Sequence, residues 1–475
     1  MRPARVAAAG LALALVPACT FGVRRAAPTP SPTVAPTTAR PTPSGSASPA
    51  SCPAEYAAPL PSRPHVTLTF DLGEDGRTVR GTERVAFTPD RQITELVFRA
   101  WANAPGTAEN GGRLEVTRAS LPMTVERAGG HRKAPGTLIR LALPRPSPAG
   151  RGVVADLAFT LTLPESDVDR YGYDATTAWW GSGHPMLAWQ NGRGWATEPA
   201  VGILGETATS EAADFDVTVT APARYTVVAS GLTGAPSEAD GGRKAWHFEN
   251  AVARDVAVVA GQFEVETFSA QGTPVLVAMD ASLETRLTAG PIRANVLAAF
   301  RDFTRRFGRF PYESLTVVAL PAVGGAGIEY PGLIFVGDRR YELVVTHEVA
   351  HEWFYGLVGN NQAVDPWLDE AFATYAETLV NDTAENHLGA YELRQDVGLP
   401  MTYWHEHPDD YGDIVYSKGA AALLLARRES PELFDDAIRC YVNARAYRIA
   451  TVADLAAALA GIPRAVEILR EAGAL

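Results

Sequence analysis

The stretch that decides the fold runs from Val345 to Ala376 and reads VTHEVAHEWFYGLVGNNQAVDPWLDEAFATYA. His347 and His351 stand four residues apart in a segment with helical patterning, so both imidazoles project from one face and can bind a single ion. Glu348 follows the first histidine, and on a helix its carboxylate lies beside such an ion, where it can accept a proton from metal-bound water. The spacing predicts a helix that carries a metal site.

A third ligand is expected from a second helix. Glu370 lies nineteen residues after His351, in a helical stretch that Asp365 and Pro366 can start as cap and first-turn residue. Two histidines, one glutamate and a water form the ligand set of an open catalytic zinc site, so we expect one Zn²⁺ per chain. The alternative is an ordinary amphipathic helix with two surface histidines.

The motif resembles a known zinc signature. HEVAHEWFYGLVG together with WLDEAFATYAE resembles the zinc-binding signature of the gluzincin aminopeptidases, the aminopeptidase N and leukotriene hydrolase type. That family usually has Asn-Glu before Gly-Phe-Ala, whereas this chain has Asp369 and Glu370 before Ala-Phe-Ala and so keeps the ligand. The resemblance implies an α+β fold, in which an N-terminal all-β saddle or sandwich precedes a thermolysin-like zinc catalytic domain.

A glycine-rich segment before the zinc helix extends the resemblance. The family has Gly-x-Met-Glu-Asn where this chain reads AGIEY, residues 326–330. The resemblance implies that Glu329 binds the free α-amino group of a peptide, which counts off one residue to the scissile carbonyl. Gly327 lets the backbone approach a substrate closely. Tyr330 departs from the family's asparagine, and a solvated strand-edge acid is the alternative for Glu329.

One tyrosine follows the zinc helices. Tyr416 lies in YSKG, just ahead of an apolar helix expected from about residue 420, and the family has a tyrosine in a similar setting. The resemblance implies that its phenol stabilises the oxyanion of the tetrahedral intermediate. The alternative is a tyrosine that only anchors the start of the helix.

The N-terminus predicts export. Arg2 and Arg5 precede an apolar run that ends in Pro-Ala-Cys19, so residues 1–19 resemble a bacterial lipoprotein signal in which Cys19 is lipidated. The run is too short for a persistent membrane span, and a plain secretory signal is the alternative. Residues 20–58 are rich in Pro, Thr and Ser and predict a disordered tether.

Composition narrows the class of protein. The chain has 46% hydrophobic residues and a formal net charge of −12, which argues against nucleic acid as a partner. Membrane contact is expected only through the lipid anchor. With Cys19 lipidated, Cys52 and Cys440 remain as a possible disulfide, although two free thiols are an equal alternative.

Two folded domains are expected after the tether. Residues 59–267 show period-two segments separated by Gly, Pro, Asp and Ser turns, which predicts an all-β domain. Within it, Glu198 is interpreted as a turn residue without a catalytic role. Residues 268–475 form the expected catalytic domain, with a helix over about 291–307. The family's larger members continue into a closing helical domain, which this chain is expected to lack.

The combined prediction is a zinc aminopeptidase that acts on peptides with a free N-terminus. Zinc lowers the pKa of its water, Glu348 serves as the base, and Tyr416 steadies the oxyanion. Two alternatives stay open, namely a thermolysin-like zinc endopeptidase and a surface or scaffold protein that has lost its activity.

Overall fold

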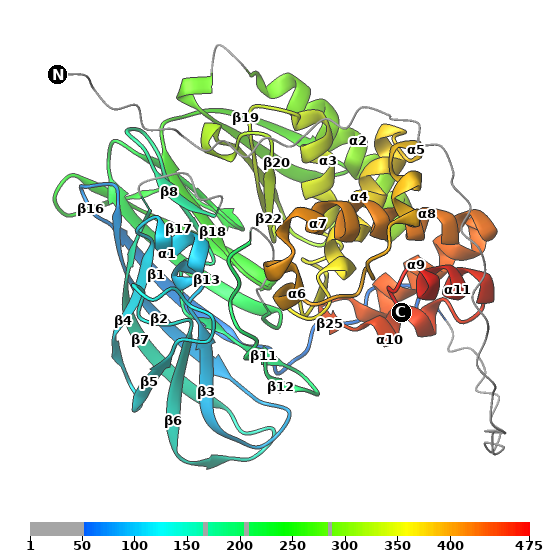
Figure 1. The fold of residues 1–475 in the computed structure, drawn as a ribbon. Helices are drawn as coiled ribbons and strands as arrows, with labels where there is room; N and C mark the ends of the chain where they lie inside the picture. Colours follow the sequence, from blue (N-terminus) through cyan, green and yellow to red (C-terminus); the bar gives the residue numbers. More distant parts are fainter. Residues whose placement is uncertain (1–51, 165–169, 204–208, 284–286) are drawn as a thin grey trace, which may run out of the picture. The chain divides into compact units, whose positions relative to one another are not determined.

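The computed structural model describes residues 52–164, 170–203, 209–283 and 287–475 (Figure 1). Residues from Ser51 to Leu475 form one compact unit. The signal segment with Cys19, and the tether up to residue 51, lie outside the described residues. Among the described residues, no helix has the length and apolar character needed to cross a bilayer.

The first half of this unit is built of β-sheets, as the period-two pattern predicts. On β1 (His65–Leu72) side chains alternate between exposed and buried, because successive residues of a strand face opposite sides of the sheet. The main sheet has the order β15-β17-β13-β1-β2-β7-β4. Its strands are β15 (Leu232–Thr233), β17 (Arg243–Ala253), β13 (Ala213–Pro222), β1, β2 (Thr78–Phe87), β7 (Val153–Thr162) and β4 (Arg113–Ala119), and β16 (Ser237–Ala239) pairs with β17.

Smaller sheets complete this half. One has the order β10 (Met186–Leu187), β3 (Ile93–Arg99), β6 (Leu138–Ser147) and β5 (Met123–Glu126), and another pairs β11 (Trp189–Gln190) with β12 (Gly194–Trp195). A further sheet has the order β14 (Thr226–Ala229), β18 (Ala257–Gly261), β9 (Ala178–Gly181) and β8 (Tyr171–Tyr173). Strands β8 to β12 give no alternation in the sequence, because strands such as β9 are buried on both faces.

The catalytic half combines a sheet with helices, which confirms the α+β expectation. Its sheet has the order β19 (Phe263–Ala270), β20 (Thr273–Asp280), β21 (Leu315–Ala319), β23 (Leu333–Val336) and β22 (Gly327–Tyr330). Because β19 already belongs to this sheet, the change of sheet falls at Gln262, a few residues before the predicted boundary at 267. The principal helices are α2 (Ala289–Phe307), α3 (Tyr341–His351), α4 (Trp367–Asn381), α8 (Gly419–Glu429), α9 (Pro431–Arg445) and α11 (Pro463–Glu471).

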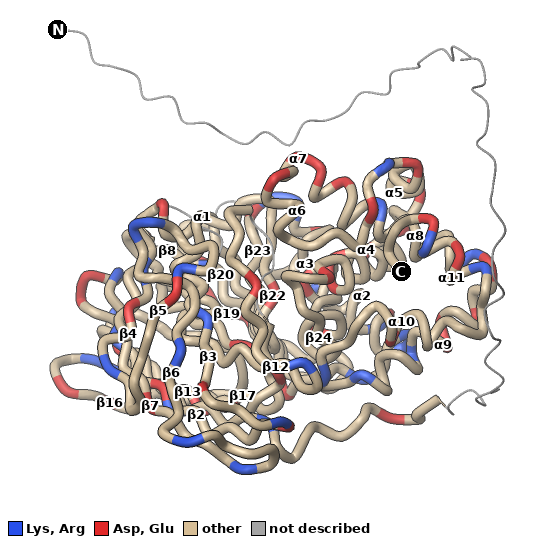
Figure 2. Tube along the Cα trace, turned by 60° about the horizontal axis from the view of Figure 1, so that its bottom comes forward, with Lys and Arg blue, Asp and Glu red and all other residues tan. Residues whose placement is uncertain are grey.

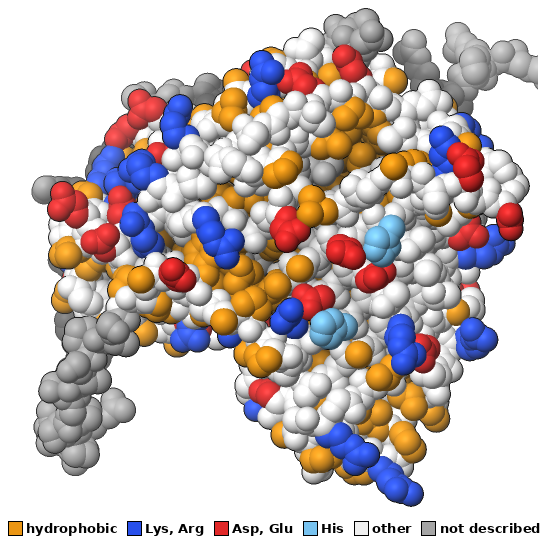
Figure 3. Space-filling view, turned by 180° about the vertical axis from the view of Figure 1, so that it is seen from behind, with side chains coloured by type: hydrophobic (Ala, Val, Ile, Leu, Met, Phe, Trp, Pro, Cys, Tyr) orange, Lys and Arg blue, Asp and Glu red, His pale blue; other side chains and the backbone are white. Residues whose placement is uncertain are grey.

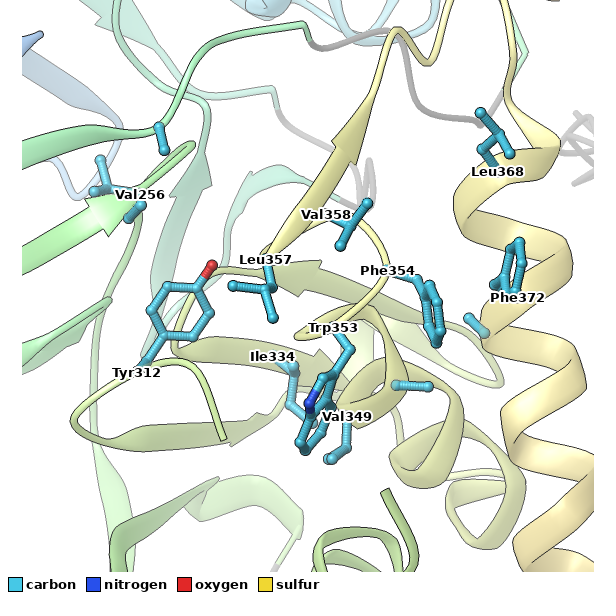
Figure 4. Packing of buried hydrophobic residues seen from close by; sticks show 14 of the residues in the cluster. Val256, Tyr312, Ile334, Val349, Trp353, Phe354, Leu357, Val358, Leu368 and Phe372 are labelled. Atoms are coloured by element: carbon cyan, nitrogen blue, oxygen red, sulfur yellow. The ribbon is translucent and has the colours of Figure 1, made fainter. Parts of the chain in front are cut away.

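Aromatic packing fixes α3 between its neighbours (Figure 4). Trp353, just beyond α3, is fully buried, and its ring centroid lies 5.7 Å from that of Phe303 on α2. Phe354 stacks on Phe372 of α4 with centroids 4.6 Å apart. Buried aromatic side chains of this size dominate core energetics, so α3 is held rigidly on both sides.

The end of the predicted tether is ordered, which corrects the expectation of disorder for residues 52–58. Cys52 and Cys440 form a disulfide, with Cα atoms 5.1 Å apart, so the sequence alternative of two free thiols does not hold. The Tyr56 hydroxyl donates to the Arg309 carbonyl at 2.5 Å and accepts from Trp353 Nε1 at 3.2 Å. The low apolar content that predicts disorder is offset here by a covalent bond and hydrogen bonds to the catalytic half.

The surface carries charges of both signs. On the face shown in Figure 3, basic and acidic side chains are interspersed, with apolar groups between them.

One acid is buried in the β half without a partner. Glu83 occupies an inward position of β2 and is 2% exposed, and its Oε2 has no hydrogen-bond partner among the described residues. Burial raises the pKa of Glu83 well above its usual value. Its contribution to stability is therefore present below the unfolded-state pKa of about 4.3 and is lost as pH rises toward the folded-state pKa.

We expect Glu83→Gln to flatten this pH dependence. Between about pH 4.3 and pH 8, the free energy of unfolding of the wild type should fall by more than that of the variant. In this range the wild type must either bury the charge of Glu83 or keep its carboxyl protonated, whereas the glutamine does not titrate. Urea unfolding at pH 5 and pH 8 measures the difference. Glu249→Gln removes an exposed acid from β17 of the same sheet and is the matched control. Parallel pH profiles for wild type and Glu83→Gln would contradict the expectation.

Candidate active site

Three side chains converge as the sequence predicts. Nε2 of His347 lies 3.1 Å from Nε2 of His351, and Glu370 Oε2 lies 3.3 Å and 3.4 Å from these two atoms. Their ligand atoms all lie within 4.8 Å of one another, and the side chains are 13%, 1% and 5% exposed. Two imidazoles and a carboxylate gathered in a buried cluster fit a zinc ion by the chemistry of their donor atoms.

The cluster binds protons when no ion is present. Burial alone lowers the pKa of His351, but the charges of Glu329 and Glu370 outweigh it and raise that pKa to about 9. Burial acts to raise the pKa of Glu370, yet His351 and His347 hold it well below its usual range. A metal ion must therefore displace protons from the imidazoles, and its affinity is expected to fall as pH falls.

Two groups that the sequence analysis missed orient the histidines. Glu377 Oε2 lies 3.3 Å from His347 Nδ1, and the Phe354 carbonyl lies 3.0 Å from His351 Nδ1. When Nδ1 carries the proton and donates it to such an acceptor, the lone pair of Nε2 is left free for a metal ion. Glu377 follows Glu370 by seven residues, two helical turns on one face of α4, and that spacing is a sequence signal that could have found it.

We expect Glu377→Ala to weaken zinc binding by about 10–100-fold, because His347 loses the carboxylate that fixes its ring and tautomer. Competition with a chromogenic chelator measures the dissociation constant. Glu385→Ala, which removes an acid that is 80% exposed at the start of α5 (Glu385–Leu388), is the control. Equal zinc affinities for wild type and Glu377→Ala would rule out this role.

Glu348 is positioned as a base beside the cluster. It is 4% exposed, and its Oε2 has no hydrogen-bond partner in the described part of the chain. Burial raises the pKa of Glu348 to about 8, against the lowering effect of His347 and His351. A Cβ on Gly327 would lie 2.4 Å from Glu348 Oε1, so a side chain at this position of β22 would displace the carboxylate. The predicted contact of Gly327 with substrate stays a prediction.

Glu329 lies two residues after Gly327, on the same side of β22 (Figure 2, acidic positions in red on β22 and α3). One of its carboxylate oxygens lies within 4.8 Å of ligand atoms of Glu348 and His351. The side chain is 5% exposed, and Oε1 has no hydrogen-bond partner within the described ranges. A buried carboxylate oxygen without a hydrogen-bond partner is suited to bind a cationic group of a ligand.

Tyr330 faces away from the cluster. It is 1% exposed, and Arg170 Nη1 donates to its hydroxyl at 3.1 Å. A Cβ on Gly181 of β9 would lie 1.9 Å from the Tyr330 hydroxyl oxygen, so the ring fills the space of a missing side chain. The residue that departs from the family's asparagine therefore anchors β22 against the β half.

Tyr416 lies over the first histidine. It belongs to the π-helical turn Gly412–Lys418 that leads into α8, and its ring stacks on His347 with centroids 5.9 Å apart and planes 14° apart. Burial and the negative charge of Glu370 raise the pKa of Tyr416 well above its usual value. The phenol stays protonated and can act as a hydrogen-bond donor.

The start of α4 differs from the prediction. The helix begins at Trp367, and its N-cap is Pro366 rather than Asp365. Asp369 orients the ligand instead, because it accepts from Gln362 Nε2 at 2.7 Å and from the Glu370 amide at 2.7 Å. The aspartate that replaces the family's asparagine is thus part of the support for Glu370.

Glu198 joins the two halves. Its carboxylate accepts from Asn361 Nδ2 at 3.3 Å and from Arg99 Nη2 at 3.3 Å. Arg99 is 1% exposed and Glu198 is 17% exposed, so this ion pair of the β half is largely buried. The geometry agrees with a residue outside the catalytic cluster.

The family profile of the "Peptidase family M1 domain" matches residues 295–469, which contain every residue of the cluster. This part of the chain is therefore similar to a peptidase family M1 domain. The chain is similar to aminopeptidase N of Streptomyces lividans, with 27% identity over 293 residues, which cover 52% of this chain and 33% of the relative. Aminopeptidase M1-A of Oryza sativa subsp. japonica is 26% identical over 282 residues, covering 52% of this chain and 32% of that protein. The chain spans about a third of the length of these relatives.

Solved M1 structures share the fold. A variant of the M1 zinc metallopeptidase from Deinococcus radiodurans bound to a Tyr-Ser-Ala substrate superposes with a TM-score of 0.66 at 20% identity. The match covers 87% of this chain and 94% of that chain. The β half and the half that follows it therefore share the fold of that metallopeptidase.

Proposed function

We propose that this protein is a zinc-dependent aminopeptidase that releases N-terminal residues from peptides. The observation that carries the proposal is the convergence of a His, His, Glu cluster with two buried carboxylates, Glu348 and Glu329. Each has one oxygen without a hydrogen-bond partner among the described residues. The first carboxylate suits a base, and the second suits an ammonium group. The M1 domain and the named aminopeptidase relatives support the same activity.

His347, His351 and Glu370 would hold the zinc, which when bound acidifies water and polarises a carbonyl. Glu348 accepts a proton from the attacking water and then delivers it to the leaving nitrogen. The Tyr416 phenol donates a hydrogen bond to the carbonyl oxygen as that oxygen gains negative charge. Glu329 pairs with the substrate's ammonium group and so places the first peptide bond beside Glu348.

Metal analysis tests the proposal. We expect one zinc per chain after purification without chelator, and loss of aminoacyl-substrate hydrolysis when a chelator removes it. Added zinc should restore turnover. Hydrolysis that persists after the zinc has been removed would overturn the proposal, and an active-site cluster that binds no zinc would favour an inactive scaffold.

We also propose that the protein is exported and anchored through Cys19. The signal-like segment supports this location, and so does the Cys52–Cys440 disulfide, because disulfides persist in oxidising compartments. Mass spectrometry of the mature N-terminus tests the anchor. A lipidated Cys19 is expected, and a mature protein that begins elsewhere without lipid would contradict it.

A further inference from the structure

A buried arginine of the β half contacts the turn that follows the zinc helix. Arg254 lies on the connection between β17 and β18 and is 3% exposed. Its guanidinium donates to four backbone carbonyls on three separate segments. The partners are Tyr355 at 2.9 Å and Gly356 at 3.2 Å from Nε, Ser210 at 3.0 Å from Nη1, and Arg448 at 2.6 Å from Nη2. Only a planar fork of donors can serve these directions together.

The surroundings are fitted to this guanidinium. A Cβ on Gly359 of β24 (Val358–Asn360) would lie 2.3 Å from Arg254 Cζ, so a side chain there would displace it. Burial lowers the pKa of Arg254, and the negative charge of buried Glu211 opposes that effect. Removing the hydrogen bonds of a buried cation costs much free energy, because the charge is left without compensation.

The turn that Arg254 holds is conformationally unusual. Tyr355 has a φ of 117°, a region that side-chain-bearing residues rarely adopt and that persists only where surrounding contacts enforce it. The preceding residue, Phe354, supplies the carbonyl that lies 3.0 Å from His351 Nδ1. The Gly356 amide also donates to the His351 carbonyl at 2.9 Å. Arg254 therefore fixes the backbone on which the orientation of His351 depends.

We propose that Arg254 is a positioning residue for the zinc site, which acts through the 354–356 turn on the imidazole of His351. The inference rests on the zinc site proposed above and adds that the β half sets the geometry of one ligand. It explains why a tyrosine is tolerated at a φ that favours glycine. It also assigns a role to a residue that lies far from the zinc motif in sequence.

The test compares zinc dissociation constants with unfolding midpoints of the metal-free proteins. We expect Arg254→Lys to raise the zinc dissociation constant about 10–100-fold, because an ammonium cannot replace the fork and the Phe354 carbonyl moves. Arg99→Lys is the matched control. Arg99 is similarly buried, but among the described residues it donates to Ala196 and Glu198 of the β half and not to the 354–356 turn. Arg99→Lys should lower the midpoint and leave the zinc dissociation constant unchanged.

A second substitution separates positioning from general destabilisation. Tyr355→Gly in the Arg254→Lys background removes the conformational cost of the turn, so we expect most of the zinc affinity to return. If Arg254→Lys does not fold, Gly359→Ala displaces the guanidinium more gently and should raise the zinc dissociation constant in the same direction. An unchanged constant in the folded variant would overturn the proposal, as would an equal rise in Arg99→Lys. A wild type that binds no zinc would instead remove the proposed function itself.

Discussion

Glu348→Gln will retain zinc and lose about 100-fold or more of its peptide hydrolysis. The amide keeps the shape of the side chain but cannot accept a proton from water, and a positioned base contributes about 10²–10⁴-fold to rate. The three ligand side chains are untouched, so metal content should not change. Turnover of a fluorogenic aminoacyl substrate and zinc content, measured on the same preparation, give the result.

The control for this variant lies on the same helix. Glu342→Gln makes the identical chemical change in the first turn of α3, where the side chain is exposed. It should leave turnover and zinc content as in the wild type. Near-normal hydrolysis by Glu348→Gln would remove Glu348 from the role of base, whereas loss of zinc would show that it supports the metal instead.

Glu329→Gln will lower kcat/KM for peptides with a free N-terminus by about 10–100-fold. The loss follows from replacing a charge-assisted contact to ammonium by a neutral one, worth about 1.5–3 kcal/mol. An acetyl-capped peptide has no ammonium, so the wild type should cleave it poorly and Glu329→Gln should not reduce that further. Rates for matched free and capped peptides measure the effect.

Glu264→Gln, an exposed change on β19, is the control for this comparison. Equal cleavage of free and capped peptides by the wild type would contradict the role of Glu329. It would favour the thermolysin-like endopeptidase, which has no need of a free N-terminus. A Glu329→Gln variant that keeps the full free-peptide preference would point to another group as the ammonium partner.

The sequence predicts those parts of the site that depend on local spacing. His347, His351 and Glu348 follow from helical periodicity, and the alternation of β1 and β2 follows from the pleat of a strand. The structure brings the predicted residues together at the cluster. They include Tyr416 and Glu329, which the resemblance to the gluzincin signature indicates. Their chemical roles stay predictions until the variants are measured.

The remainder depends on contacts between distant segments. Nothing near Arg254 in sequence indicates that it binds the turn at Tyr355, and the fit of Tyr330 against Gly181 involves two different strands. Residues 52–58 have the composition of a tether, but their order comes from Cys440 and the catalytic half. Such features are set by tertiary structure, which overrides local composition and propensity.

The most direct test of the central claim is mass spectrometry of the products from one peptide and its N-acetylated twin. The zinc-loaded protein should release the first residue from the free peptide and leave the capped twin intact. A chelator should abolish the release, and added zinc should restore it. Internal fragments formed equally from both peptides, or release that survives removal of zinc, would contradict the account.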